Sequence, residues 1–158
     1  ELNKSTKSGQ HFGFPYWNGK FKVAGSPAAP DLKGMKEPRG AIFPQVNFPA
    51  HQAQLGMTFG SKTNFPDKYK NGIFVAAHGS WNRTEASGAE VQFVPVKKGK
   101  AGKMEVFANG FLNKKTGTYH GRPVDVAVMK DGSMLVSDDY AGAIYRISYN
   151  GERVASTK

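Results

Sequence analysis

The stretch GRPVDVAVMKDGSMLVSDDYAGAIYRISY, residues 121–149, decides the fold class of this chain. It contains apolar runs at 122–129, 133–139 and 143–149, and the turn sequences KDG and YAG separate them. Alternation of apolar and polar residues is typical of half-buried strands, and turns of the Asp-Gly type are typical of hairpins. The stretch therefore predicts a three-stranded antiparallel meander.

The residues before it repeat this pattern. Further short apolar stretches are separated by Gly, Pro, Asn or Lys turns, and no segment has three turns of helical periodicity. These stretches lie at 55–60, 72–78, 90–96 and 103–109. The two groups resemble each other at a period of roughly 70 residues, measured from Met57 to Val126. A repeated antiparallel meander favours an all-β fold of four-stranded β-propeller blades.

The first 50 residues are different, because prolines interrupt any long strand there. These prolines are Pro27, Pro30, Pro38, Pro44 and Pro49. We expect one partial β-propeller domain over 1–158. It would consist of an irregular, aromatic and Pro-rich entry segment at 1–50, one blade at 51–118 and most of a further blade at 119–158.

Composition narrows the function classes. The 158 residues are 39% apolar and include 19 Gly and 9 Pro, which fits one turn-rich domain with a real core. The absence of cysteine excludes disulfides, thiol nucleophiles and cysteine-ligated zinc. A net charge of +10 suits an anionic partner: a nucleic acid, an acidic surface or a polycarboxylated small molecule. The lysine clusters at 97–103 and 113–117 favour solvated hairpin tips over a nucleic-acid interface.

A group of polar and aromatic residues follows the apolar run GIFVAA, in the sequence HGSWNR at 78–83. An indole stacks on sugar rings, and amide and guanidinium groups hydrogen-bond to hydroxyls. We therefore predict that Trp81, Asn82 and Arg83 bind substrate. The alternative for Trp81 is that it fills a gap between neighbouring blades.

Arg122 directly precedes a predicted inner strand, and its planar guanidinium is suited to gripping a carboxylate. The alternative is an arginine that bridges two strand ends. Asp138 and Asp139 are neighbours on a strand, so their side chains point to opposite faces and favour capping of the following turn over acid–base chemistry. His51 and His120 have no ligand spacing, and we predict no metal ligands in this chain.

The motifs AHQAQLGMTF (50–59), FPDKYKNGIFVAAHGSWNRT (65–84) and the stretch at 121–149 together resemble the glucose/sorbosone dehydrogenase family. These are the soluble quinoprotein sugar dehydrogenases, which use pyrroloquinoline quinone (PQQ) with calcium. The resemblance implies a six-bladed propeller, of which this chain would form about three blades in the C-terminal part. It also implies oxidation of a sugar hemiacetal or aldehyde by hydride transfer to the quinone, and a periplasmic or secreted location.

The resemblance further implies that Arg122 and Phe12 bind the cofactor. His78 ends a buried strand beside Gly79, so we predict that it hydrogen-bonds the cofactor or a sugar hydroxyl, although better-known members of the family carry a lysine near this point. Phe12 belongs to the aromatic motif HFGFPYW at 11–17, which an ordinary core strand explains equally well, and His78 could instead be satisfied by a neighbouring blade. Val124 stands where many relatives have a second arginine.

The family's histidine base and calcium-binding loop lie upstream, so no catalytic residue is assigned here. We expect the chain to need a missing N-terminal half, or a second copy, for activity. The alternative is a non-catalytic basic module, derived from such a propeller, that binds carbohydrate or acidic polymers.

Overall fold

The computed structural model describes residues 1–23, 32, 34–37 and 39–151. It divides into two compact units, Glu1–Phe48 and Pro49–Lys158. The strand pairs are antiparallel, and the described helical segments are two single 3-10 turns, η1 (Gly60–Lys62) and η2 (Asp67–Tyr69). In the described ranges, no helix has the length and apolar character needed to cross a membrane. The prediction of an all-β chain with antiparallel sheets is confirmed.

The first unit contains little regular structure. A two-stranded hairpin, β1 (Trp17–Asn18) and β2 (Phe21–Lys22), is its one sheet among the described residues, and a bridge joins Leu2 to Val46. Of the prolines expected to break strands here, Pro27, Pro30 and Pro38 lie outside the described residues.

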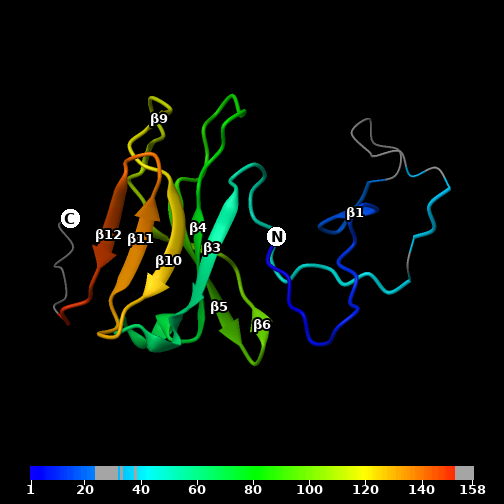
Figure 1. Cartoon of the computed structure of the whole chain (residues 1–158), viewed down its shortest axis with the longest axis horizontal. Helices are drawn as coiled ribbons and strands as arrows, with labels where there is room; N and C mark the ends of the chain where they lie inside the picture. The colour runs from blue at the N-terminus through cyan, green and yellow to red at the C-terminus, as the bar shows by residue number, and fades with distance from the viewer. Residues whose placement is uncertain (24–31, 33, 38, 152–158) are drawn as a thin grey trace. The chain divides into compact units, whose positions relative to one another are not determined.

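The second unit begins with a larger sheet, drawn from cyan to green in Figure 1. Its strands are β3 (Gln54–Phe59), β4 (Gly72–Ala77), β5 (Glu90–Lys97), β6 (Lys100–Ala101) and β7 (Glu105–Ala108). The order is β3-β4-β5-β6, and β7 also pairs with β5. A short hairpin, β8 (Leu112–Asn113) and β9 (Thr118–Tyr119), follows it.

The last sheet is the predicted meander. Its strands are β10 (Pro123–Val128), β11 (Met134–Asp138) and β12 (Ala143–Ile147), in that order. All seven predicted strands are present, with bounds close to those predicted. The hairpin turns KDG and YAG also lie where the sequence places them, because Gly132 and Gly142 adopt the positive φ angles that such turns require.

The core lies between these two sheets. β10 lies beside β3 and β4 in Figure 1, and apolar side chains of both sheets form one buried cluster. The cluster consists of Phe65, Phe74, Ala76, Val91, Phe93, Val126, Met134 and Val136. Burying each of the large side chains contributes about 1.5–3 kcal/mol, so this contact fixes one sheet against the other.

The opposite face of β3 carries exposed apolar side chains. Gly56 abuts Asp125 of β10, and alternation along the strand places its neighbours on the other face. Leu55, Met57 and Phe59 are 50%, 45% and 63% exposed. We call these three residues the outer row. Such a row on an edge strand is unusual for a chain that works alone.

Candidate functional site

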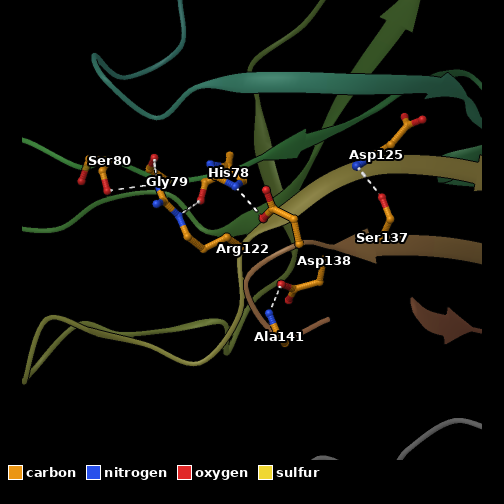
Figure 2. Close-up of polar contacts among 9 residues, drawn as sticks. His78, Gly79, Ser80, Arg122, Asp125, Ser137, Asp138 and Ala141 are labelled. Carbon is orange, nitrogen blue, oxygen red and sulfur yellow. Dashed lines mark hydrogen bonds and ion pairs between the residues drawn. The ribbon is translucent and has the colours of Figure 1, made fainter. Parts of the chain in front are cut away.

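The ends of three strands bring polar groups together (Figure 2). His78 follows β4, Arg122 precedes β10, and Asp139 follows β11. We call His78, Gly79, Ser80, Arg122 and Asp139 the strand-end site. Because β10 and β11 pair Pro123 with Asp138, Arg122 and Asp139 lie side by side at the end of their sheet, and both contact His78 at the end of β4.

Arg122 holds the backbone that leaves β4. Its Nε donates to the carbonyl of His78 at 3.1 Å, and its Nη2 donates to those of Gly79 at 2.7 Å and Ser80 at 3.3 Å. The guanidinium also lies over the ring of Tyr119, 4.9 Å from its centre. These contacts match the predicted alternative, an arginine that bridges two strand ends. Its Nη1 makes no hydrogen bond in the described part of the chain, and cofactor binding by Arg122 stays a prediction.

His78 pairs with Asp139, its neighbour in the next sheet. The distance from His78 Nε2 to Asp139 Oδ1 is 2.9 Å, and the histidine side chain is only 20% exposed. The hydrogen bond from His78 is the main reason that the pKa of Asp139 lies below its usual value. Since a carboxylate only accepts hydrogen bonds, the imidazole carries its proton on Nε2, and a neutral His78 has Nδ1 available as an acceptor.

Asp138 caps the turn before β12, as predicted. Its Oδ1 accepts the backbone N–H of Ala141 at 2.8 Å, whereas Asp139 is exposed. The other oxygen, Oδ2, is buried and makes no hydrogen bond of standard geometry among the described residues. Tyr145 lies near this carboxylate, and burial, followed by the charge of Asp138, raises the pKa of the Tyr145 hydroxyl. Beside these residues lies a shallow hollow of about 300 Å³, lined by Val124, Ser137, Asp138, Asp139, Gly142, Ala143 and Ile144.

The loop after Ser80 presents the predicted substrate-binding residues. Trp81 is 84% exposed, and Asn82 and Arg83 are exposed as well. Arg83 fixes the loop, since its Nε donates to the Glu85 carbonyl at 3.2 Å and its Nη1 to that of Ala50 at the same distance. Trp81 fills no gap between the described sheets of this chain, and the alternative of a gap between neighbouring blades stays a prediction. Substrate binding by these residues stays a prediction.

Phe12 belongs to the first unit, where it is half-buried. Its neighbour Phe14 is 82% exposed, so the two residues do not form the ordinary core strand that was the alternative. The role of Phe12 toward a cofactor stays a prediction.

Sequence reasoning missed a set of buried polar residues behind the loop. Gln92 is fully buried, and Glu90 and Gln52 are 4% and 5% exposed. Gln92 Nε2 donates to Gln52 Oε1 at 2.8 Å and to Glu90 Oε1 at 2.9 Å. The alternation in EVQFVPV gave one signal, since it places Glu90 and Gln92 on the same face of a strand, but such a face is usually solvated.

The molecule thus defined is an all-β protein with a charged site at the edge where its antiparallel sheets meet. The model of the family described as TrAA12-like matches residues 37–150. This is most of the chain, and the chain belongs to this family.

The relatives are considerably longer than this chain. A curated protein of Borreliella burgdorferi, described as uncharacterized, is 37% identical over 157 residues, which are 94% of this chain and 38% of the relative. The chain therefore spans about two fifths of the curated relative that it matches.

Two solved structures are also similar to this chain. The holo form of the pyranose dehydrogenase PQQ domain from Coprinopsis cinerea has a TM-score of 0.55 and 26% identity, over 69% of this chain and 30% of that one. The calcium structure of a Trichoderma reesei protein of carbohydrate-active enzyme family AA12 has a TM-score of 0.61 and 17% identity, over 89% of this chain and 38% of that one. At 17% identity, the similarity to the second structure shows the fold alone.

The predicted membership of the glucose/sorbosone dehydrogenase family is wrong, because the matching family is TrAA12-like. The two functions predicted from that membership, a sorbosone-type sugar dehydrogenase and a non-catalytic module descended from one, are wrong for the same reason. The physical reason lies in the motifs. Arg122 braces a loop and Asp138 caps a turn, and such fold-building roles recur in proteins of different families.

Proposed function

We propose that this chain forms part of an AA12-like oxidoreductase domain that binds PQQ, with the strand-end site as its contribution to the cofactor site. The observation that carries the proposal is the guanidinium of Arg122, which is held in one orientation with Nη1 left over. A fixed guanidinium with a spare donor is suited to a carboxylate, and PQQ carries three. The similarity to a PQQ domain supports the choice of ligand.

The residues of the strand-end site fit the quinone. Arg122 offers a charged donor, and a neutral His78 offers an acceptor at Nδ1 for a hydroxyl of a substrate. When bound, the quinone would supply a two-electron acceptor. In the described ranges, no group of three or more His, Cys, Asp or Glu residues could hold a metal. Carbonyl oxygens also bind calcium, and we assign the ion no role here.

Trp81 suits a saccharide as substrate. Its indole is almost fully exposed on a loop that Arg83 ties to two carbonyls, so stacking of a pyranose ring would cost little ordering. Asn82 and Arg83 are close enough in sequence to reach the hydroxyls of the same ring. The proposed periplasmic or secreted location is compatible with such a substrate and stays a prediction.

The outer row of β3 indicates where a further part of the same domain would pack. Its three apolar side chains would be covered by a further antiparallel sheet of the same domain, in the way that the β10–β12 sheet covers the other face. The relatives have ample length for more sheets. Sheets stacked in this order would form a β-propeller, and six blades is the arrangement we propose. The missing sheets, or a second copy of this chain, would supply the cover.

The experiment is a titration of the 158-residue chain with PQQ, followed by quenching of intrinsic fluorescence. We expect saturable 1:1 binding that Arg122→Lys weakens about tenfold or more, because a lysine cannot brace the three carbonyls and bind a carboxylate. Arg146→Lys is the matched control, since Arg146 is exposed and pairs with Asp131 far along β12.

Near-ultraviolet circular dichroism of each variant tests whether it is folded. If the folded wild-type chain binds no PQQ, or if both lysine variants bind it equally, the proposed role of the strand-end site is wrong.

A further inference from the structure

The loop of the strand-end site is connected to a buried carboxylate by a continuous series of hydrogen bonds. The series starts at Glu90, whose carboxylate has no cation within ion-pair distance among the described residues. It passes through Gln92 and Gln52, and Gln52 Nε2 then donates to Ser87 Oγ at 2.8 Å. The backbone N–H of Ser87 donates to Ser80 Oγ at 3.0 Å.

The series ends at Tyr119, beside Arg122. The distance between Ser80 Oγ and the Tyr119 hydroxyl is 3.2 Å, and that hydroxyl donates to the Ser80 carbonyl at 2.7 Å. The same carbonyl accepts from Arg122. A residue at the start of β5 is therefore linked to the backbone that Arg122 braces.

Glu90 sets the direction of the first donors in this series, those of Gln92 and Gln52. An ionised carboxylate only accepts hydrogen bonds, so Gln92 must turn its NH₂ toward it. That NH₂ also serves Gln52 Oε1, and Gln52 must then point its own NH₂ at Ser87. From Ser87 onward the backbone sets the direction: Ser80 Oγ accepts from the backbone N–H of Ser87, which leaves the hydroxyl hydrogen of Ser80 for Tyr119. With a neutral amide at position 90, the main acceptor that orients the Gln92 amide is lost, and only the longer hydrogen bond from Gln54 Nε2 to Gln92 Oε1, at 3.4 Å, still favours that orientation.

The backbone around this series is strained, and the strain has to be offset. Ala53, Ala89 and His51 have φ angles of 49°, 51° and 64°. A left-handed conformation costs a non-glycine residue about 1–2 kcal/mol, and such residues persist where the surroundings hold them. The base of the loop is also closed tightly, since a Cβ at Gly88 would lie 2.9 Å from the Cα of Gly79.

We propose that Glu90 is a positioning residue for the strand-end loop. It acts through Gln92 and Gln52 on the side chain of Ser87, whose backbone N–H holds Ser80 beside Tyr119. It keeps residues 79–88 in one conformation before any ligand arrives. The use of this loop for PQQ or a saccharide rests on the proposed function, but its ordering by Glu90 does not.

The test is hydrogen–deuterium exchange of the 158-residue chain without ligand. The amides of Ser80 and Ser87 report on the loop, and the amide of Phe74 in β4 reports on the core. We expect Glu90→Gln to speed exchange of the two loop amides about tenfold while Phe74 is unchanged. Glu105→Gln, at an exposed position in β7, is the matched control and should change neither.

A double-mutant comparison separates positioning from general support. Tyr119→Phe removes the far end of the series but keeps the ring under Arg122. If the two substitutions act independently, each speeding loop exchange about tenfold, the double variant should exchange about a hundredfold faster. If they belong to one series, the double variant should exchange little faster than either single variant. A hundredfold effect, an unchanged loop in Glu90→Gln, or equal acceleration of loop and core would each overturn the proposal.

If Glu90→Gln does not fold, Ser87→Ala takes its place. This substitution removes Ser87 Oγ, which accepts a hydrogen bond from Gln52 Nε2, and leaves Glu90 and Gln92 intact. The same local acceleration supports the proposal, and its absence overturns it. PQQ titration of the folded variants then tests the proposed function separately, because loop exchange is measured without the cofactor.

Discussion

Replacing Arg122 by methionine should destabilise the second unit more than the same change at Arg146. Methionine retains the apolar stem but loses three hydrogen bonds, of 2.7, 3.1 and 3.3 Å, to the backbone carbonyls of the half-buried His78 and the buried Gly79 and Ser80. A hydrogen bond with a charged donor contributes about 1.5–3 kcal/mol, and the two longer bonds and partial solvent access reduce the sum. We therefore expect a loss of about 2–4 kcal/mol in the free energy of unfolding.

The measurement is urea unfolding followed by circular dichroism, with the slope against urea compared between variants. A loss of this size should lower the melting temperature by roughly 5–15 °C. Arg146→Met removes an exposed ion pair, whose partners are 60% and 52% exposed, and a 3.1 Å hydrogen bond to Ser133 Oγ, and should cost about 1–1.5 kcal/mol. Equal losses in the two variants would refute the bracing role that the contacts assign to Arg122.

Three further predictions follow from the packing and the charges. Phe59→Lys should weaken concentration-dependent self-association, measured by sedimentation velocity. Met129 is exposed outside the outer row, so Met129→Lys should leave self-association unchanged. If the two variants behave alike, the outer row is not a docking surface. Gly121→Ala should cost about 1–3 kcal/mol in urea unfolding because an added Cβ overlaps Asp138 Oδ2, and a neutral result would mean that this carboxylate can move away. The pKa of Asp139 is lowered in the folded protein, so its carboxylate adds stability that is present above the unfolded pKa of about 3.9 and is lost as pH falls through the lower folded value. Asp139→Asn should flatten this acid-side loss in the stability profile, and an unchanged profile would contradict the contact with His78.

The strands could be predicted from the sequence because their signals are local. Glycines at 132 and 142 end their strands through conformations that few other residues adopt, and the alternation in 121–149 marks the buried face. The cap formed by Asp138 was predictable for the same reason, since its partner is only three residues away. Local chemistry was sufficient wherever both partners lie in one turn.

The candidate site depends on contacts between distant residues, and these could not be predicted. His78 and Asp139 are 61 positions apart, and Gln52 and Gln92 are 40 apart. The pairing of the sheets brings them together, and nothing near each residue indicates its partner. The family was misassigned for a related reason. The short motifs contain residues that stabilise turns and loops, and such residues occur in more than one family.

The close approach of Gly79 and Gly88 has a consequence for how this protein could diversify. The two glycines and the paired serines beside them close the loop at its base. Residues 81–85 are exposed. Insertions or replacements in that segment would therefore leave the register of β4 and β5 untouched. New recognition loops could be grafted there, as they are between the framework strands of an antibody, while Gly79 and Gly88 stay as the fixed attachment points.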